Sequence, residues 1–154
     1  MVVKYDELDL EILRELKENS KTPYRKMAAK LGVHPNTLMQ RIKRLEREKI
    51  IEKYTVELNF DKIGYETQVV ILMKARGGKI GDRSQLSDLA KIPQVQSLYG
   101  ITGTYDVIAF LLVKSRDELV AVLKNIQEHP VVARTNSHII LFSYKTFEDF
   151  NPLK

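Results

Sequence analysis

Apolar residues near the start of the chain recur with a helical period. Within residues 5–22 the steps from Leu8 to Ile12, from Ile12 to Leu16 and from Leu13 to Leu16 are three or four positions long. This spacing places all four on one face of a helix. We therefore predict an amphipathic helix that ends near residues 18–23.

A second, short helix is predicted to follow. Thr22 is a good N-cap, and Pro23 suits the first helical position because it has no N–H to leave unpaired. We expect this helix through residues 24–31, with Met27, Ala28 and Leu31 facing inward. Gly32 can then take the left-handed conformation that ends a helix.

A third helix is predicted to begin near Pro35, and its two faces differ in chemistry. One side gathers the apolar residues Leu38, Ile42 and Leu45. The other gathers Asn36, Gln40, Lys43 and Arg47, with Thr37, Arg41 and Arg44 beside them. Asn, Gln, Arg and Thr can read base edges, and Lys neutralises phosphate. A short helix, a turn through glycine and a second helix of this kind are typical of a helix-turn-helix.

The second half of the chain alternates predicted strands and helices. Residues 50–60 have the pattern of a strand, and residues 61–66 that of a short linker. Further strands are expected at residues 67–75, 94–102, 107–115 and 135–145, and helices at residues 83–92 and 116–129. This β-α-β-β-α-β order predicts a ferredoxin-like fold, in which an antiparallel sheet carries both helices on one face.

The other face of that sheet should be apolar. The runs "VVILM" and "IAFLLV" are apolar at successive positions, so both faces of their strands carry apolar side chains. An uncovered face of this kind would expose a hydrophobic surface to water. We therefore expect two chains to pair through their sheets.

Composition supports an ordinary folded protein. The chain has 154 residues, of which 44% are hydrophobic and none is cysteine, so it can bury a core but cannot form disulfides or thiolate metal sites. No apolar run approaches the roughly 20 residues of a membrane helix, and the first residues do not resemble an export signal. We expect a cytoplasmic protein that does not contact membranes.

The positive charge is concentrated in one block. Residues 21–53 carry ten Lys and Arg against three Asp and Glu, whereas the whole chain has a net charge of +5. Such a block is typical of a surface that binds a polyanion. A solvated basic face and a three-helix module that docks to protein are the alternative interpretations.

No pattern indicates an active site. His34, His129 and His138 lack the spacing of metal ligands, and no phosphate loop, nucleophile elbow or paired-carboxylate motif is present. We predict no catalytic residue, no metal and no cofactor. An enzyme of amino-acid metabolism is the less favoured alternative. An architectural protein that coats DNA without sequence preference is another, since it would carry the same charges.

Six segments together resemble one known family. They are "LDLEILREL", "KMAAKLGV", "PNTLMQRIKRLE", "IIEKYTVELN", "GITGTYDVIAFLLV" and "VARTNSHIILFSYK", and they are similar to segments of the Lrp/AsnC, or feast/famine, transcriptional regulators. The resemblance implies an α+β chain with a winged helix-turn-helix domain at residues 1–50, a strand and linker at 51–66, and a ferredoxin-like (RAM) domain at 67–154. Members form homodimers, often assembled into tetramers or octamers.

Two positions depart from the family pattern. His34 stands where the family commonly has Ser, and Lys49 stands where it commonly has Gly. The first is a poorer helix cap, so we expect a slight shift of the helix start. The second removes a glycine from the turn that leads into the following strand.

The resemblance also implies two sets of functional residues. Those expected at double-stranded DNA are Thr22, Tyr24, Arg25, Pro35, Asn36, Thr37, Gln40, Arg41, Lys43, Arg44 and Arg47. Those expected at a small effector, usually an amino acid bound between dimers, are Gly100, Thr102, Gly103, Thr104, Tyr105, Asp106, Thr135, Asn136 and Ser137. A Gly-rich turn exposes backbone groups to such a ligand, and the carboxylate of Asp106 could pair with its amine. An ordinary hairpin turn at residues 103–106 is the alternative.

Overall fold

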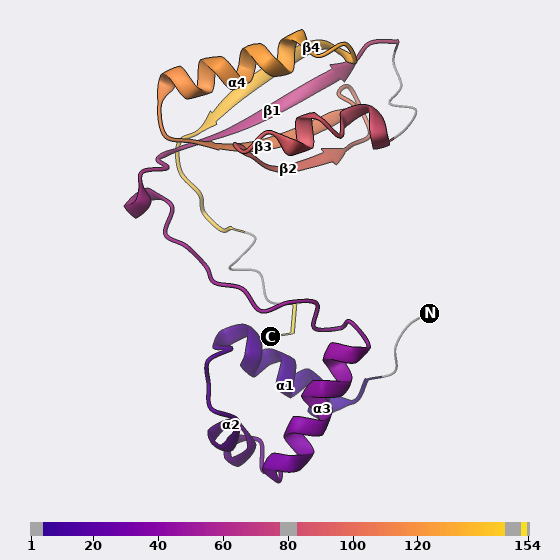
Figure 1. Ribbon diagram of the computed structural model, residues 1–154, viewed down its shortest axis with the longest axis vertical. Coiled ribbons are helices and arrows are strands. Elements are labelled where there is room, and N and C mark those ends of the chain that lie inside the picture. The colour runs from indigo at the N-terminus through magenta and orange to yellow at the C-terminus, as the bar shows by residue number, and fades with distance from the viewer. Residues whose placement is uncertain (1–4, 78–82, 147–151, 154) are drawn as a thin grey trace. The chain divides into compact units, whose positions relative to one another are not determined.

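The computed structural model describes residues 5–77, 83–146 and 152–153 (Figure 1). Two compact units form. The first comprises the described residues of 1–57 together with those of 145–154, and the second comprises those of 58–144. The described residues of 145–154 had been expected in the second domain, and residues 51–57 in the linker.

Three helices build the first unit. They are α1 (Glu7–Glu18), α2 (Tyr24–Lys30) and α3 (Pro35–Arg47), close to the predicted ranges. Their apolar stripes meet in one core of buried side chains, which comprises Ile12, Leu16, Met27, Ala28, Leu38, Ile42 and Leu45. The helical period of the sequence therefore identified the core of this unit.

The start of α2 differs from the prediction. Pro23 is itself the N-cap, with φ −57° and ψ 134°, and no side chain caps the helix. Its extended ψ keeps Pro23 out of the helix, while its carbonyl accepts from the N–H groups of Lys26 and Met27. The expected N-cap role of Thr22 is therefore wrong.

The turn from α2 to α3 agrees with the prediction. Gly32 has φ 66°, and its N–H donates to the carbonyl of Ala29 while the N–H of Val33 donates to that of Ala28. This is the Schellman arrangement that ends many helices. α3 then begins at Pro35, because the Nδ1 atom of His34 accepts from the N–H of Asn36 at 3.2 Å. His34 therefore caps the helix without the expected shift of its start.

Lys49 ends α3 in the same manner but without glycine. Its φ is 56°, and it is the one non-glycine residue with positive φ among those described. The N–H of Lys49 donates to the carbonyl of Glu46, and the N–H of Ile50 to that of Leu45. The turn thus keeps the geometry that glycine would favour, at a cost in backbone strain.

Replacing Lys49 with glycine should stabilise the first unit by about 0.5 to 1 kcal/mol. Glycine removes the steric cost of the left-handed conformation, but it also raises the conformational entropy of the unfolded chain, which offsets part of that gain. Lys49→Gln is the matched control, since it removes the charge and keeps the side chain. Urea denaturation of the three proteins measures the effect. Equal stabilisation by both variants would assign the effect to charge instead.

The predicted strand at residues 50–60 is absent. The structure assigns no strand to residues 50–60, and Tyr54, Val56 and Leu58 are exposed. A strand is stable only when hydrogen-bonded to a neighbour, and every strand of the described sheet lies between residues 67 and 140. Residues 50–60 thus have the alternating pattern of a strand but no partner strand within the described part of the chain.

The second unit has the predicted ferredoxin-like sheet. Its strands are β1 (Thr67–Ala75), β2 (Val95–Gly100), β3 (Val107–Val113) and β4 (Val132–Ile140). They are antiparallel in the order β2-β3-β1-β4. The helix α4 (Arg116–Glu128) connects β3 to β4 and begins at an N-cap, Ser115, whose hydroxyl accepts from the N–H of Glu118.

The first crossover is not the predicted helix. Two short 3₁₀ turns, Arg83–Leu86 and Leu89–Lys91, stand in its place, and the residues 78–82 before them lie outside the described part. Both Leu86 and Leu89 are buried in the core. Leu86 ends the first turn and Leu89 begins the second, so each short turn buries one of these side chains.

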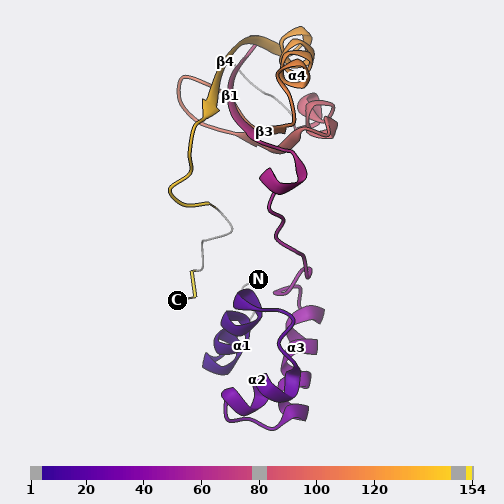
Figure 2. The same cartoon turned by 90° about the vertical axis from the view of Figure 1, so that its left-hand side faces the viewer.

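The helix α4 and the two 3₁₀ turns of the first crossover pack on one face of the sheet, as Figure 2 shows for α4. Between them lies a core that includes Val69, Ile71 and Met73 of β1 and Ile126 of α4. The alternate residues of β1 and β3 face the other way and are only half-buried: Val70, Leu72, Ile108 and Phe110. One face of the sheet is thus apolar and uncovered within the single chain.

Candidate DNA-binding and effector sites

The polar face of α3 is open to solvent. Its exposed residues are Asn36, Thr37, Gln40, Lys43 and Arg47. None of these side chains has a hydrogen-bonded or ion-paired partner among the described residues. The opposite face of the same helix is buried in the core. The exposed face of α3 therefore carries hydrogen-bond donors and acceptors that are available to a binding partner.

The other residues expected at DNA lie at the ends of α2 and α3. Tyr24 and Arg25 are exposed in the first turn of α2, whereas Thr22 and Pro35 are half-buried. Tyr24 and Arg25 thus add a phenol and a guanidinium to the exposed surface of the helix-turn-helix.

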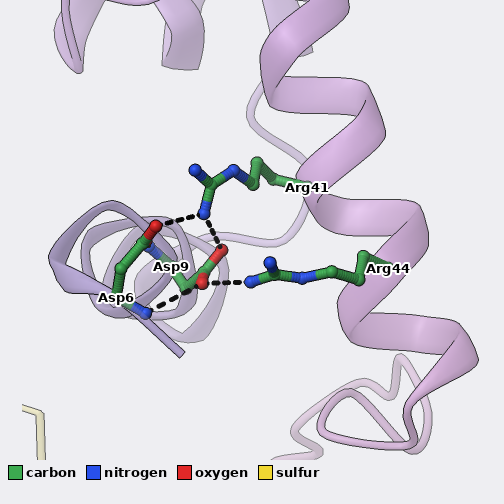
Figure 3. Close-up of polar contacts among 4 residues, drawn as sticks. All are labelled: Asp6, Asp9, Arg41 and Arg44. Atoms are coloured by element: carbon green, nitrogen blue, oxygen red, sulfur yellow. Dashed lines mark hydrogen bonds and ion pairs between the residues drawn. The ribbon is translucent and has the colours of Figure 1, made fainter. Parts of the chain in front are cut away.

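Arg41 and Arg44 are oriented differently from the rest of the set. Figure 3 shows both guanidinium groups extending from α3 toward the start of α1. Nη1 of Arg41 lies 3.2 Å from Oδ1 of Asp9 and also contacts Oδ2 of Asp6, while Nη2 of Arg44 contacts Oδ2 of Asp9. Their side chains are only 29% and 31% exposed. These two arginines are therefore engaged within the unit.

Asp9 lies at the centre of this network and is completely buried, with 0% of its surface exposed. The N–H of Asp6 donates to Oδ2 of Asp9 at 3.0 Å, and the N–H of Asp9 donates to Oδ1 of Asp6 at 3.1 Å. This reciprocal pair is a capping box for α1. Both carboxylates also benefit from the positive end of the helix dipole.

The electrostatics of the network agree with its geometry. The hydrogen bond from Arg41, followed by that from the backbone of Asp9, lowers the pKa of Asp6 below its ordinary value. The hydrogen bond to Asp6 in turn raises the pKa of Arg41. Nε of Arg44 is buried without a partner in the described structure, so Arg44 is held through its terminal nitrogen.

The sequence patterns did not identify Asp6 and Asp9 as the partners of Arg41 and Arg44. Their signal was present, because two acids three residues apart at a helix start match two arginines three residues apart on α3. A separation of three in each helix places both pairs on adjacent turns. Only the packing of α1 against α3 brings the two pairs together.

The predicted effector turn joins β2 to β3. Gly103 has φ 112°, and the N–H of Ile101 donates to the carbonyl of Asp106 at 2.9 Å. The carboxylate of Asp106 is already bound by β1, since it accepts from the N–H of Ala75 at 2.8 Å and from Nζ of Lys74 at 2.9 Å. These contacts, the backbone bond first, lower its pKa. Asp106 therefore anchors the turn to β1.

The predicted effector residues of the last strand, β4, lie on both faces of the sheet. Nδ2 of Asn136 donates to the hydroxyl of Tyr105 at 3.3 Å, and the guanidinium of Arg134 lies 5.8 Å from the centre of the Tyr105 ring. Thr135 accepts from Gln127 of α4 at 3.2 Å. Asn136 is thus brought to the turn, on the uncovered face.

Thr135 and Ser137 alternate with Asn136 along β4 and so project from the helical side of the sheet. On that side a hollow of about 270 Å³ is lined by Gln127 and residues 132–135. Thr135 is the only member of the predicted effector set that lines it. The structure therefore divides the predicted set between the two faces.

Other kinds of site are not found in the described residues. Across residues 5–77, 83–146 and 152–153, no three His, Asp or Glu side chains gather as metal ligands would. None of the helices built from these residues is both long and apolar enough to cross a bilayer.

A helix-turn-helix with an exposed polar recognition face, joined to a ferredoxin-like unit, defines a class of DNA-binding transcriptional regulators. The comparisons agree with this class. Residues 6–46 match the AsnC-type helix-turn-helix domain, and residues 68–149 match the Lrp/AsnC ligand binding domain. The chain belongs to the Lrp/AsnC family.

Relatives extend over nearly the whole chain. An uncharacterized HTH-type transcriptional regulator of Pyrococcus furiosus is 37% identical over 96% of this chain and 97% of its own length. The structure of Escherichia coli AsnC is similar with a TM-score of 0.85 and 27% identity, over 95% of this chain and 99% of that one. A transcriptional regulator from Neisseria meningitidis, solved with L-methionine, shares the fold with a TM-score of 0.83 and 23% identity over 93% and 94% of the two chains.

Proposed function

We propose that this regulator binds specific DNA sequences by inserting α3 into the major groove. The observation that carries the proposal is the separation of α3 into a buried apolar face and an exposed face with unpartnered side chains. Asn36 and Gln40 have amide groups that can pair with adenine, and Lys43 and Arg47 can reach phosphate. The concentration of positive charge in residues 21–53 also supports DNA binding by this surface.

Two substitutions on α3 should separate base reading from phosphate binding. Gln40→Ala should cost about 1 to 3 kcal/mol on the preferred site and relax the preference at one base pair, while Lys43→Ala should weaken all sequences alike. Sites selected from random duplexes, followed by titration of each variant, measure both effects. Gln96→Ala on β2 and Lys17→Ala on α1 are the matched controls, because both residues are exposed elsewhere.

The opposite results are equally informative. Unchanged affinity and footprints for both α3 variants would contradict the placement of α3 in the groove. Equal affinity of the unmodified protein for selected and competitor DNA would favour an architectural protein without sequence preference.

We further propose that two chains pair through the uncovered face of the sheet. The half-buried side chains of Val70, Leu72, Ile108 and Phe110, with exposed Tyr99, form an apolar surface on three adjacent strands. A second copy offers the same surface in reverse, so a two-fold dimer would cover both at once. Such a dimer presents two recognition helices to two half-sites. Tetramers or octamers could then form from dimers.

We also propose that a small effector, of the amino-acid class, binds at the turn of residues 100–106. Thr102, Gly103 and Thr104 are exposed there, and Asn136 and Tyr105 lie beside them on the uncovered face. A carboxylate has about four acceptor sites, so Asp106 could accept from a ligand amine as an addition to its bonds with Lys74 and Ala75. The match of residues 68–149 to a ligand binding domain supports this assignment.

Calorimetry with each standard amino acid, methionine included, tests the effector proposal. For an amino acid that binds, Asn136→Ala should weaken binding about tenfold, because one hydrogen bond of roughly 1 to 1.5 kcal/mol is lost. Asn125→Ala is the matched control, since Asn125 is exposed on α4. Equal affinity of both variants for the ligand would place its site elsewhere. The absence of binding heat with every amino acid would contradict the proposal of an amino-acid effector.

A further inference from the structure

We propose that Asp9, together with Asp6, is a positioning residue for DNA recognition. The two carboxylates hold Arg41 and Arg44 against α1, so that these arginines orient α3 instead of contacting DNA. The proposal rests on the proposed function, since it takes α3 as the recognition helix. It gives Arg41 and Arg44, two cations of the basic block at residues 21–53, a role within the unit.

The geometry of the contact favours positioning. The two acids stand three residues apart at the start of α1, where Asp6 is the N-cap, and the two arginines stand three residues apart on α3. Two contacts on successive turns fix both the rotation of α3 and its displacement along its own axis. The apolar contacts of the core cannot do this as sharply, because hydrophobic burial is non-directional, whereas charge-assisted hydrogen bonds depend on distance and angle.

Because Asp9 is buried, Arg41 and Arg44 should remain bound to it in preference to DNA phosphate. Asp9 has no exposed surface, so loss of its arginines would leave a carboxylate without solvent. A buried charge without partners is strongly unfavourable, while an arginine–phosphate contact at an exposed surface is screened by salt. Arg44 therefore keeps Asp9 when DNA is present. Arg41 is held in the same way, by Asp9 and by Asp6.

This assignment leaves fewer cations for DNA than the sequence suggests. Ten Lys and Arg lie in residues 21–53. Arg41 and Arg44 are paired with Asp6 and Asp9, and Lys30 is paired with Glu15. The slope of log affinity against log salt counts the phosphates that a protein neutralises, at about 0.9 per contact. A positioning arginine does not contribute to that slope, but it does affect the geometry on which base reading depends.

The experiment uses the full-length protein and three single variants: Arg44→Gln, Asp9→Asn and Lys43→Gln. Affinity is measured for the selected site and for competitor duplex across a series of salt concentrations. We expect Lys43→Gln to reduce the salt slope by about one. We expect Arg44→Gln to leave the slope unchanged and to reduce the ratio of specific to competitor affinity at least tenfold.

Asp9→Asn gives a second, opposite signal. It frees Arg44 and leaves Arg41 with Asp6 alone, so the salt slope should rise, by about one for each arginine that finds a phosphate, while the ratio of affinities falls at least tenfold. The double variant Asp9→Asn with Arg44→Gln replaces a buried ion pair by two amides that can bond to each other. It should recover part of the ratio that each single variant loses, because neither partner remains as an unpaired charge.

Two results would overturn the proposal. The first is a fall of about one in the salt slope for Arg44→Gln, equal to that for Lys43→Gln, which would make Arg44 a phosphate contact. The second is an unchanged ratio of affinities for both Arg44→Gln and Asp9→Asn. Should Asp9→Asn unfold, Arg41→Gln provides the second measurement, because it leaves Asp9 with Arg44. Unchanged binding by Gln40→Ala and Lys43→Gln would instead contradict the proposed function.

Discussion

Replacing Asp9 with alanine should lower the free energy of unfolding of the first unit by about 3 kcal/mol. Removal of one member of a buried ion pair typically costs about 3 to 5 kcal/mol, because the remaining charge stays buried without compensation. The lower end applies here, since Arg41 and Arg44 keep access to some solvent. The variant also loses one half of the capping box of α1.

Urea unfolding followed by the circular dichroism of the helices measures this change. Asp6→Ala is the comparison, because Asp6 shares the network but its side chain is 53% exposed. We expect a clearly smaller loss for Asp6→Ala. A loss for Asp9→Ala no larger than that for Asp6→Ala would show that burial of the carboxylate contributes little.

Replacing Ile108 with aspartate should dissociate the proposed dimer. Ile108 lies on β3 at the uncovered face, opposite Leu72 of β1. In a two-fold interface each chain would bury one new carboxylate among apolar side chains, and a buried unpaired charge costs several kcal/mol. We expect the dissociation constant of the dimer to rise at least hundredfold, which corresponds to about 2.7 kcal/mol.

Val120→Asp is the matched control for this prediction. Val120 is 56% exposed on α4, the helix that covers the other face of the sheet, so the same change of side chain occurs outside the proposed interface. Sedimentation velocity of both variants measures the assembly, and circular dichroism checks that each remains folded. If Ile108→Asp stays a dimer, or if Val120→Asp dissociates as well, the uncovered face is not the interface.

Much of the fold could be predicted from local patterns. The spacing of Ile12 and Leu16 in α1 and of Leu38, Ile42 and Leu45 in α3 gave the helices and their buried faces, because a helical period determines which side chains share a face. Gly32 gave the turn between α2 and α3 for a similar reason, since a left-handed residue favours glycine. These features depend on residues within one or two turns of each other.

The features that were missed depend on distant partners. The alternation of Tyr54, Val56 and Leu58 predicted a strand, but a strand forms only beside a neighbour, and none lies beside this segment in the described chain. The partners of Asp106 are on β1, some thirty residues earlier in the chain. Likewise, the helical pattern placed Arg41 and Arg44 beside the residues expected at DNA, and only the packing of α1 against α3 shows that both are paired with Asp9.

The buried carboxylate of Asp9 also limits the routes by which this sequence can change over generations. Loss of the acid alone leaves Arg44 without its ion-pair partner and Arg41 with Asp6 alone, and loss of Arg44 alone leaves a buried acid with only one arginine. Either single step is unfavourable, although a jointly neutral or apolar set at the same positions can be as stable as the ion pair. The residues at 9, 41 and 44 are therefore epistatic, and a lineage that leaves the present combination must pass through a destabilised intermediate or change two codons together.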